Sequence, residues 1–262
     1  MLRPRIIPCL LIQNKGLVKT MKFRDPKYIG DPLNAVRIFN EKAVDEIIIV
    51  DIDATRMNFE PNYKMIENIA AECRMPLCYC GGVKNKEQAQ RIFSLGVEKV
   101  AISSEVIKNP YLIKQISDFV GSQSMVVVLD VKKNKMGVYE IWTHNGTRNT
   151  EIEVSLFAKL AEELGAGEII INSIDQDGMM NGYDFELVGL VRSSIHLPLT
   201  ILGGAGSLDD IDKLIKKYGI IGASAGSLFV FKGIFRAVLI NYPNSEVKGE
   251  IFKSAYTNKH IN

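Results

Sequence analysis

The chain has 262 residues, of which 47% are hydrophobic and 24% are charged, and its formal net charge is +2. This balance is typical of a globular protein, and the small net charge gives no sign of a nucleic-acid or anionic-membrane partner. The length is close to the roughly 250 residues of one eight-fold barrel, and no apolar run approaches the about 20 residues that span a bilayer.

The first apolar run covers residues 5–12 and is interrupted by Gln13, Asn14 and Lys15. A signal peptide needs a longer apolar stretch and a small-residue cleavage site. We therefore expect this run to be a buried strand, and the protein to be cytoplasmic.

Eight short apolar runs alternate with amphipathic segments along the chain. They cover residues 5–12, 46–52, 76–80, 99–103, 125–131, 168–174, 199–202 and 220–225. Most are nearly continuous in Ile, Val and Leu, as is typical of parallel strands that are covered on both faces. Alternating strands and helices predict a parallel sheet, and eight units predict its closure. The sequence thus indicates an α/β fold, a single (β/α)8 TIM barrel spanning residues 1–262.

The segments between the runs carry helix signals. Apolar residues follow the helical period at positions 66, 69, 70 and 73, and again at 157, 160, 161 and 164. Asp31 and Asn109 each precede a proline, the pattern of a cap residue before a proline in the first turn. Ser207 and Asp210 have the spacing of a capping box.

An internal repeat divides the chain into two halves. EIIIVDID at 46–53 matches EIIINSID at 168–175, and CGGVKN at 80–85 matches LGGAGS at 202–207, both at an offset of 122 residues. We expect two half-barrels, at about 1–122 and 123–244. Residues 245–262 form a tail that we expect to be loosely ordered, with no assigned function.

Two long segments follow the first and fifth strands. Residues 13–30 carry five basic residues and predict a long first loop, and a loop of this length in a compact domain is usually functional or mobile. Residues 132–150 predict a small hairpin that turns at Asn145-Gly146. Both segments lie at the carboxyl ends of strands, where barrel enzymes place their chemistry.

The cysteines and histidines give no support for a metal site. Cys78 and Cys80 lie two residues apart on a predicted strand and so share one face, but a zinc site would need a second Cys or His pair. Cys9 and Cys73 stand alone, and the three histidines are scattered. We expect reduced, mostly buried thiols, and no metal or cofactor.

Two equivalent loops have the composition of phosphate sites. Each has a Gly-Gly pair that lets the backbone approach an anion, followed by a serine-bearing strand end that can lead into a short helix. The residues are Gly81, Gly82, Ser103 and Ser104 in the first half, and Gly203, Gly204, Gly226 and Ser227 in the second. Two such sites across one barrel mouth predict a long substrate with a phosphate at each end.

Asp130 ends a strand that otherwise consists of Val and Leu, which favours general acid–base work at the barrel mouth over a turn or cap role. Its counterpart in the first half is Leu11. Because leucine cannot transfer a proton, a carboxylate pair is not available from these two positions.

Charged residues also mark the opposite face of the predicted barrel. Arg5, Glu46, Lys99 and Glu168 stand at the starts of four strands. Two positive and two negative side chains can close into a ring there. Position alone favours a stabilising role, because the amino-terminal face of such barrels usually serves stability.

These motifs together resemble the cyclase subunit of imidazole glycerol phosphate synthase, over residues 1–240. The resemblance rests on RIIPCL, GLVK at 16–19, GDP at 30–32, DEIIIVDID, CGGV, GSQ at 121–123, GAGEIIINSIDQDG and LGGAG. It implies a lyase that takes ammonia from a glutaminase docked as a heterodimer on the amino-terminal face. The ammonia would pass up the barrel to a bis-phosphorylated ribulosyl imidazole carboxamide.

The resemblance also assigns roles to residues. Arg5, Glu46, Lys99 and Glu168 match the family's ammonia gate. Lys19 resembles its loop lysine, and Asp177-Gly178 resembles its phosphate-side Asp-Gly pair. Asp130 matches one of two catalytic aspartates, whereas the other falls on Leu11.

Further departures lie at the same mouth of the barrel. Cys80 replaces a glycine, Ser103-Ser104 replace Asn-Thr, and Asn172 and Met179 each replace a threonine. This pattern resembles accessory copies of the family in surface-glycan biosynthesis, which are thought to supply ammonia to a sugar amidotransferase that builds an amidino group. Three interpretations stay open: such an ammonia-conducting subunit, a working cyclase of histidine biosynthesis, and a non-catalytic activator of the glutaminase.

Overall fold

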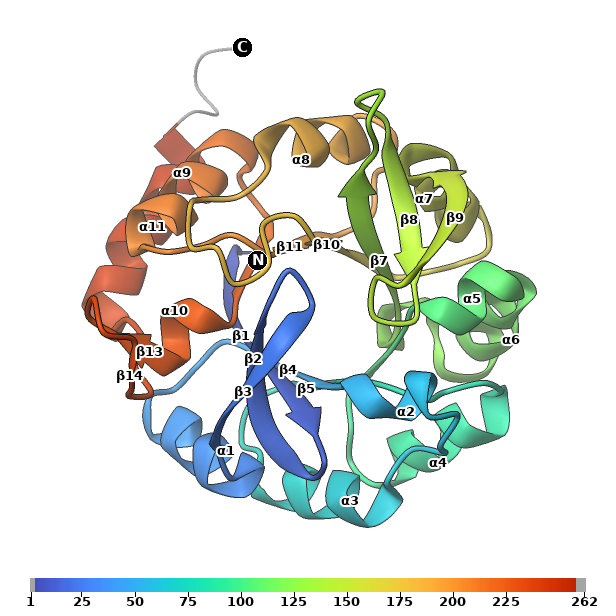
Figure 1. Cartoon of the computed structure of the whole chain (residues 1–262), viewed down its shortest axis with the longest axis horizontal. Helices are drawn as coiled ribbons and strands as arrows, with labels where there is room; N and C mark the ends of the chain where they lie inside the picture. The colour runs from blue at the N-terminus through green and yellow to red at the C-terminus, as the bar shows by residue number, and fades with distance from the viewer. Residues whose placement is uncertain (1–2, 258–262) are drawn as a thin grey trace.

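A computed structural model describes residues 3–257. Within them, eight parallel strands form a closed barrel with helices around it, as expected for a (β/α)8 fold (Figure 1). The barrel strands are β1 (Arg5–Gln13), β4 (Ile47–Asp51), β5 (Leu77–Cys80), β6 (Lys99–Ile102), β7 (Met125–Lys133), β10 (Glu168–Ser173), β11 (Leu199–Leu202) and β12 (Gly222–Ala225). Each matches one of the eight apolar runs, with ends shifted by no more than two residues.

The barrel closes between its first and last strands. β1 pairs in parallel with β12 on one side, with Arg5 opposite Gly222, and with β4 on the other, with Leu11 opposite Val50. The other barrel strands pair in parallel in chain order, including β6 with β7 and β7 with β10. All strands therefore start at one face and end at the other, which separates an amino-terminal face from a carboxyl-terminal mouth.

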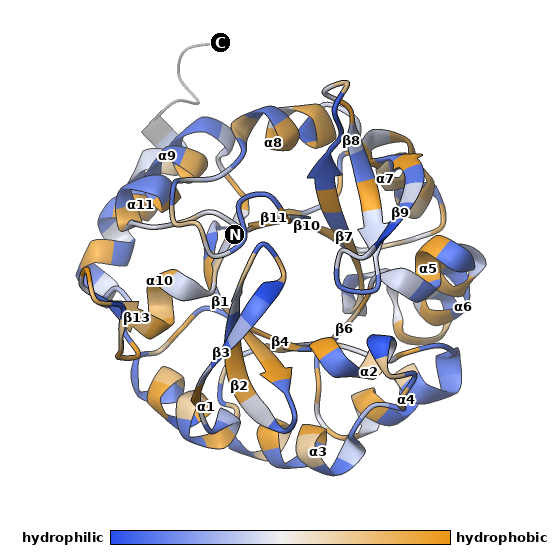
Figure 2. Cartoon of the chain, viewed as in Figure 1, coloured by the Kyte–Doolittle hydropathy of each residue, from blue (hydrophilic) through white to orange (hydrophobic). Residues whose placement is uncertain are grey.

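Helices cover the outside of the barrel, and their apolar sides form the large core against the strands. Figure 2 shows the hydrophobic colour along barrel strands such as β4 and β10, and mixed colours on the helices. The helices are α1 (Pro32–Glu41), α2 (Ile52–Arg56), α3 (Tyr63–Glu72), α4 (Lys86–Ser94), α5 (Ser104–Lys108), α6 (Tyr111–Val120), α7 (Val154–Glu163), α8 (Phe185–Arg192), α9 (Leu208–Tyr218), α10 (Ser227–Val230) and α11 (Ser245–Thr257). A single 3-10 turn, η1, covers Ser122–Ser124.

Two of the three predicted caps are confirmed. The Asp31 carboxylate accepts from the Asn34 N–H at the start of α1, and Ser207 and Asp210 form a complete capping box on α9. The cap at Asn109 is wrong: α6 begins at Tyr111 without a side-chain cap. Asn109 instead ends the preceding helix, since its N–H donates to the Glu105 carbonyl over 2.8 Å.

The first long segment is a β-hairpin, and the expectation of a loop over 13–30 is wrong. β2 (Gly16–Met21) pairs antiparallel with the extended end of β1, and β3 (Arg24–Gly30) pairs with β2. Asn14 and Lys15 make the turn with positive φ, and buried Leu17 and Val18 anchor the hairpin to the core. The hairpin predicted after the fifth barrel strand is confirmed as β8 (Tyr139–Thr143) and β9 (Arg148–Glu153). A third, small hairpin comprises β13 (Phe231–Lys232) and β14 (Ala237–Val238).

The expectation of a loosely ordered tail is also wrong for the part of the chain that is described. α11 packs on α9 with Ile251 and Ala255 buried, because Val247, Ile251 and Ala255 recur every four residues on one face. The Lys248 ammonium also lies 3.0 Å from the Asp45 carboxylate. Residues 258–262 of the tail, with His260, lie outside the described range. No helix within residues 3–257 is both long and apolar enough to cross a membrane.

Candidate functional site

The four charged side chains at the strand starts form a closed ring. Arg5 bridges Glu46 and Glu168, with 2.6 Å from Nη2 to Glu168 Oε1, and Lys99 Nζ lies 2.8 Å from an oxygen of each glutamate. Thr200 adds a hydrogen bond from Oγ1 to Glu168. The arrangement follows from strand alternation, which turns each of these side chains toward the barrel axis.

The ring keeps the buried acid Glu168 ionised. Glu46 and Glu168 are 4% and 5% exposed. Burial opposes ionisation of Glu168, but the charges of Arg5 and Lys99 outweigh it and hold the pKa of Glu168 at about 2. The predicted charged ring is thus present as a geometric feature, and it closes the amino-terminal end of the barrel axis.

An apolar column leads from the ring toward the carboxyl-terminal mouth. It consists of the packed side chains of Ile7, Cys9, Ile48, Cys78, Cys80, Ala101, Val126, Val128 and Ile170. The expectation that Cys78 and Cys80 share a face is confirmed, and all four cysteines are free. Burial raises the pKa of the thiols of Cys78 and Cys80, which keeps them protonated. Within the described residues, no cluster of three His, Cys, Asp or Glu could hold a metal ion.

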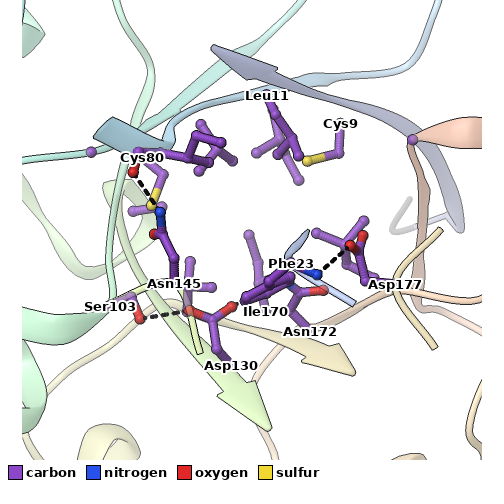
Figure 3. A pocket seen from close by; sticks show the side chains of 18 of the residues that line it. Cys9, Leu11, Phe23, Cys80, Ser103, Asp130, Asn145, Ile170, Asn172 and Asp177 are labelled. Atoms are coloured by element: carbon purple, nitrogen blue, oxygen red, sulfur yellow. Dashed lines mark hydrogen bonds between the residues drawn. The ribbon is translucent and has the colours of Figure 1, made fainter. Parts of the chain in front are cut away.

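The column opens into one pocket at the carboxyl-terminal mouth (Figure 3). All of the binding and catalytic residues that the sequence predicted for this face line it: Leu11, Lys19, Gly81, Gly82, Ser103, Ser104, Asp130, Asp177, Gly178, Gly203, Gly204, Gly226 and Ser227. Cys80 and Asn172 line it too, whereas Met179, also expected at this mouth, does not. Five of the eight barrel strands contribute through the loops that follow them, β1 and β7 contribute Leu11 and Asp130 directly, and the first hairpin contributes Lys19. The fold therefore brings both predicted phosphate loops and Asp130 into one space.

Asp130 projects into this pocket from β7. Asn172 Nδ2 donates to Asp130 Oδ1 over 2.9 Å, and Ser103 Oγ donates to Oδ2 over 3.2 Å. Burial raises the pKa of Asp130 to about 6, although the two hydrogen bonds lower it in part. A carboxyl group that titrates near neutral pH can both take and give a proton. Ser103, predicted for phosphate binding, therefore has a contact with Asp130 as well.

Leu11 lies across the pocket from Asp130 (Figure 3). It shares the apolar side of the site with Cys9, Cys80 and Val50. The two sides of the pocket thus differ: one offers carboxylate, amide and hydroxyl groups, and the other offers carbon and sulfur.

The glycine loops bring the backbone close to neighbouring strands. Gly81 has φ +145° and Gly203 has φ +94°, and a Cβ at either would lie 2.7 Å from an atom of the neighbouring strand end, Asp51 or Ser173. A side chain at either position would therefore force the loop or the strand end beside it to shift. Lys19 is buried beside the second loop: its Nζ donates to the Cys9 carbonyl over 2.5 Å, and a Cβ on Gly226 would lie 2.3 Å from it. Burial lowers the pKa of Lys19, and its amino group lies beside Gly226 of the second glycine loop.

The Asp177 carboxylate is engaged with the first hairpin. Its Oδ2 accepts from Thr20 Oγ1 over 2.7 Å and from the Phe23 N–H over 3.1 Å. A Cβ on Gly178 would lie 2.2 Å from the Thr20 carbonyl, so glycine allows the close approach. Asp177-Gly178 thus holds the hairpin over the mouth, with Phe23 at the pocket (Figure 3).

Sequence reasoning missed the contributions of two asparagines. Asn172 contacts Asp130, and Asn145 in the second hairpin donates from Nδ2 to the Ile52 carbonyl over 2.7 Å. A signal existed for Asn172, because the two-residue period of its strand places it on the same inward face as Ile170. No sequence signal points to the pairing of Asn145 with Ile52, which comes from the far half of the barrel.

Comparison with known proteins places the chain among relatives of full barrel length. The family model for histidine biosynthesis proteins matches residues 5–236. A provisionally assigned HisF subunit of imidazole glycerol phosphate synthase from Leptospira borgpetersenii is 56% identical over 253 residues, which cover 96% of this chain and 100% of that protein. A provisionally assigned hisF2 subunit from Pseudomonas aeruginosa is 51% identical over 93% of this chain and 97% of its own. The HisF subunit from Natranaerobius thermophilus is 37% identical over 92% of this chain and 96% of its own.

Proposed function

The chain belongs to the HisF family of imidazole glycerol phosphate synthase subunits, a family of lyase-type cyclases, and on that premise we propose that it conducts ammonia from a partner glutaminase to the pocket. Its cyclisation reaction is weakened or redirected. One observation carries this proposal: a complete charged ring and both glycine loops are kept, while Leu11 stands opposite Asp130 where an acid–base pair would need a second carboxylate.

The ring of Arg5, Glu46, Lys99 and Glu168 is the gate through which ammonia enters from a HisH-type glutaminase bound to the amino-terminal face. Support comes from its position at the end of the apolar column. Uncharged ammonia can enter such a column far more easily than the ammonium ion, because an ion loses its hydration there.

The substrate is a bis-phosphorylated small molecule held at both ends. Gly81, Gly82, Ser103 and Ser104 bind one phosphate, and Gly203, Gly204, Gly226 and Ser227 bind the other. Lys19 supplies a positive charge beside the second loop, as its contact with Gly226 supports. Asp130 then acts midway between the phosphates, where its pKa of about 6 suits proton transfer.

The change at Leu11 removes the second group for proton transfer. A positioned acid or base contributes about 10²- to 10⁴-fold in rate, so loss of one weakens cyclisation and leaves ammonia available to another acceptor. We propose that this acceptor is a sugar in amidino-sugar and surface-glycan synthesis, reached through a sugar amidotransferase.

A second function, a working cyclase in histidine biosynthesis, is favoured by the retained Asp130 and by the complete set of phosphate-loop residues in the pocket. A third, non-catalytic activation of the glutaminase, would use only the ring face. These three functions differ in how much cyclised product forms for each glutamine that is hydrolysed.

Reconstitution with a HisH-type glutaminase tests the proposal, with glutamine hydrolysis and cyclised product measured in the same reaction. We expect the chain and the bis-phosphorylated substrate to stimulate glutamine hydrolysis, with far less than one product formed for each glutamine. One product per glutamine would indicate the working cyclase instead. Absence of any stimulation would contradict the glutaminase partnership.

A further inference from the structure

One buried polar atom in the pocket has no hydrogen-bond partner. Among residues 3–257, the buried side-chain atoms without a partner are Tyr79 Oη, Trp142 Nε1 and Asn172 Oδ1. Of these three residues, Asn172 alone lines the pocket, and it is 9% exposed. An unsatisfied buried acceptor costs on the order of 1–3 kcal/mol, and such an atom inside a site calls for a donor that arrives with a ligand.

The orientation of the Asn172 amide follows from its neighbour. Asn172 on β10 is paired in register with Asp130 on β7, and its Nδ2 donates to the carboxylate over 2.9 Å. An ionised carboxylate only accepts hydrogen bonds, so the amide must turn its N–H toward Asp130. The amide oxygen, Oδ1, therefore points away from the Asp130 carboxylate. It lies close to that group but has no hydrogen-bond donor.

The Asn172–Asp130 pair lies at the top of the apolar column. Strand alternation places Asn172 directly after Ile170 and Asp130 directly after Val128 on the inward face, and both apolar residues belong to the column. A molecule that rises along the axis thus meets carbon and sulfur first, and then one free carbonyl oxygen beside one carboxylate. The molecule that suits this order is small, uncharged and rich in N–H donors.

We propose that Asn172 Oδ1 accepts a hydrogen bond from ammonia and holds it beside Asp130, so that the asparagine is the ammonia-positioning residue of this barrel. The inference rests on the proposed function, in which ammonia travels along this axis. With one N–H bound to Asn172, the nitrogen lone pair is free to face a carbonyl carbon of the substrate.

The addition step then balances without any further reactant. The N–C bond forms as the C=O π pair moves to oxygen. The Asp130 carboxylate takes one proton from the nitrogen and passes it to that oxygen, which gives a neutral aminoalcohol. Asn172 exchanges no proton in this step and acts only by position.

Side-chain amide NMR of the native, ¹⁵N-labelled chain tests the site without the need for an acceptor. The Asn172 amide signals are assigned by their loss in Asn172→Leu, a change of similar volume. We expect ammonium chloride to shift these signals in a saturable way, and tetramethylammonium chloride, which has no N–H, to leave them in place. Absence of a shift, or equal shifts with both salts, would overturn the inference. A specific shift in a chain that does not stimulate a glutaminase would support the ammonia site and contradict the proposed function alone.

Kinetics in the Leu11→Asp chain separate positioning from a merely structural role. Asn172→Leu and Ser103→Ala each remove one donor from Asp130, but only the first removes the free acceptor. We expect both to move the acid limb of the pH profile upward. Only Asn172→Leu should raise the KM for ammonia, by about tenfold if one hydrogen bond is lost, with a smaller change in kcat. Equal KM values for the two variants would contradict the assignment.

Discussion

Lys99 donates from Nζ to Glu168 over 2.8 Å at the amino-terminal face of the barrel, and the same ammonium group reaches Glu46 over the same distance. Arg5 bridges the same two carboxylates. Each of the two buried carboxylates therefore contacts both Arg5 and Lys99. Removal of any one member changes the charge on the whole ring.

Lys99→Ala should uncouple glutamine from product formation. The substitution leaves Glu46 and Glu168 with Arg5 alone and opens the ring, so that ammonia made by the glutaminase is lost to solvent. When the substitution is made in the Leu11→Asp chain, glutamine-driven turnover should fall while turnover with free ammonium stays near that of Leu11→Asp alone. A destabilisation on the order of 3 kcal/mol is expected from breaking a buried ion pair. Equal loss of both activities would contradict the gate assignment.

Glu168→Gln should reveal a contribution of Glu168 to the free energy of unfolding that is lost at acid pH. The pKa of Glu168 is about 2 in the folded chain, below its ordinary value of 4.5. A lowered carboxyl pKa stabilises the fold above about pH 4.5, and that contribution is lost as the pH falls toward 2. Denaturant unfolding should thus show the native chain more stable than Glu168→Gln at pH 7, with the difference shrinking below pH 4.5. A difference that does not change with pH would show that the ring charges do not set this pKa.

Asp130→Asn should abolish proton transfer and yet stabilise the fold at neutral pH. Burial raises the pKa of Asp130 from 3.8 to about 6, so ionisation costs stability as the pH rises through that interval. At pH 7 the variant should gain roughly 1–3 kcal/mol in free energy of unfolding, and at pH 4 it should gain nothing. Residual lyase activity should disappear. Surviving activity would show that Asp130 is not the acid–base group.

Asp177→Ala should release the β2–β3 hairpin from the pocket mouth. The carboxylate accepts from Thr20 Oγ1 and from the Phe23 N–H, and nearby Lys22 and Arg24 are exposed trypsin sites. Limited trypsin digestion should cleave the variant faster within residues 22–24. Glu41→Ala, an exposed change at the end of α1 and away from the cleavage sites, is the control and should leave the rate unchanged. Equal cleavage rates in both variants would show that Asp177 does not hold the hairpin in place.

The sequence predicted the barrel well because its main signals are local. Each buried parallel strand is a run rich in Ile, Val and Leu. The capping box at Ser207 depends only on two residues that lie three positions apart. The same locality explains the pocket, since strand ends in a closed parallel barrel must meet at one mouth. The division into half-barrels stays a prediction.

Features that depend on distant contacts were missed or wrong. The β2–β3 hairpin was expected as a loop, because its order comes from Asp177 in the other half of the chain. The tail helix was missed because its apolar stripe is short and is stabilised by packing on α9. The role of Asn172 needed the register that sets it beside Asp130, which no single strand reveals.

The central claim is that this barrel keeps its ammonia route and phosphate loops while Leu11 limits cyclisation. The measurement that tests it most directly is ammonium-driven turnover of the bis-phosphorylated ribulosyl imidazole carboxamide by the native chain and by Leu11→Asp, at equal substrate saturation. The account predicts little or no turnover by the native chain, and a gain of about 10²-fold or more in the variant, as a restored acid–base group supplies. Substantial turnover by the native chain, with no gain in Leu11→Asp, would contradict it and identify a working cyclase.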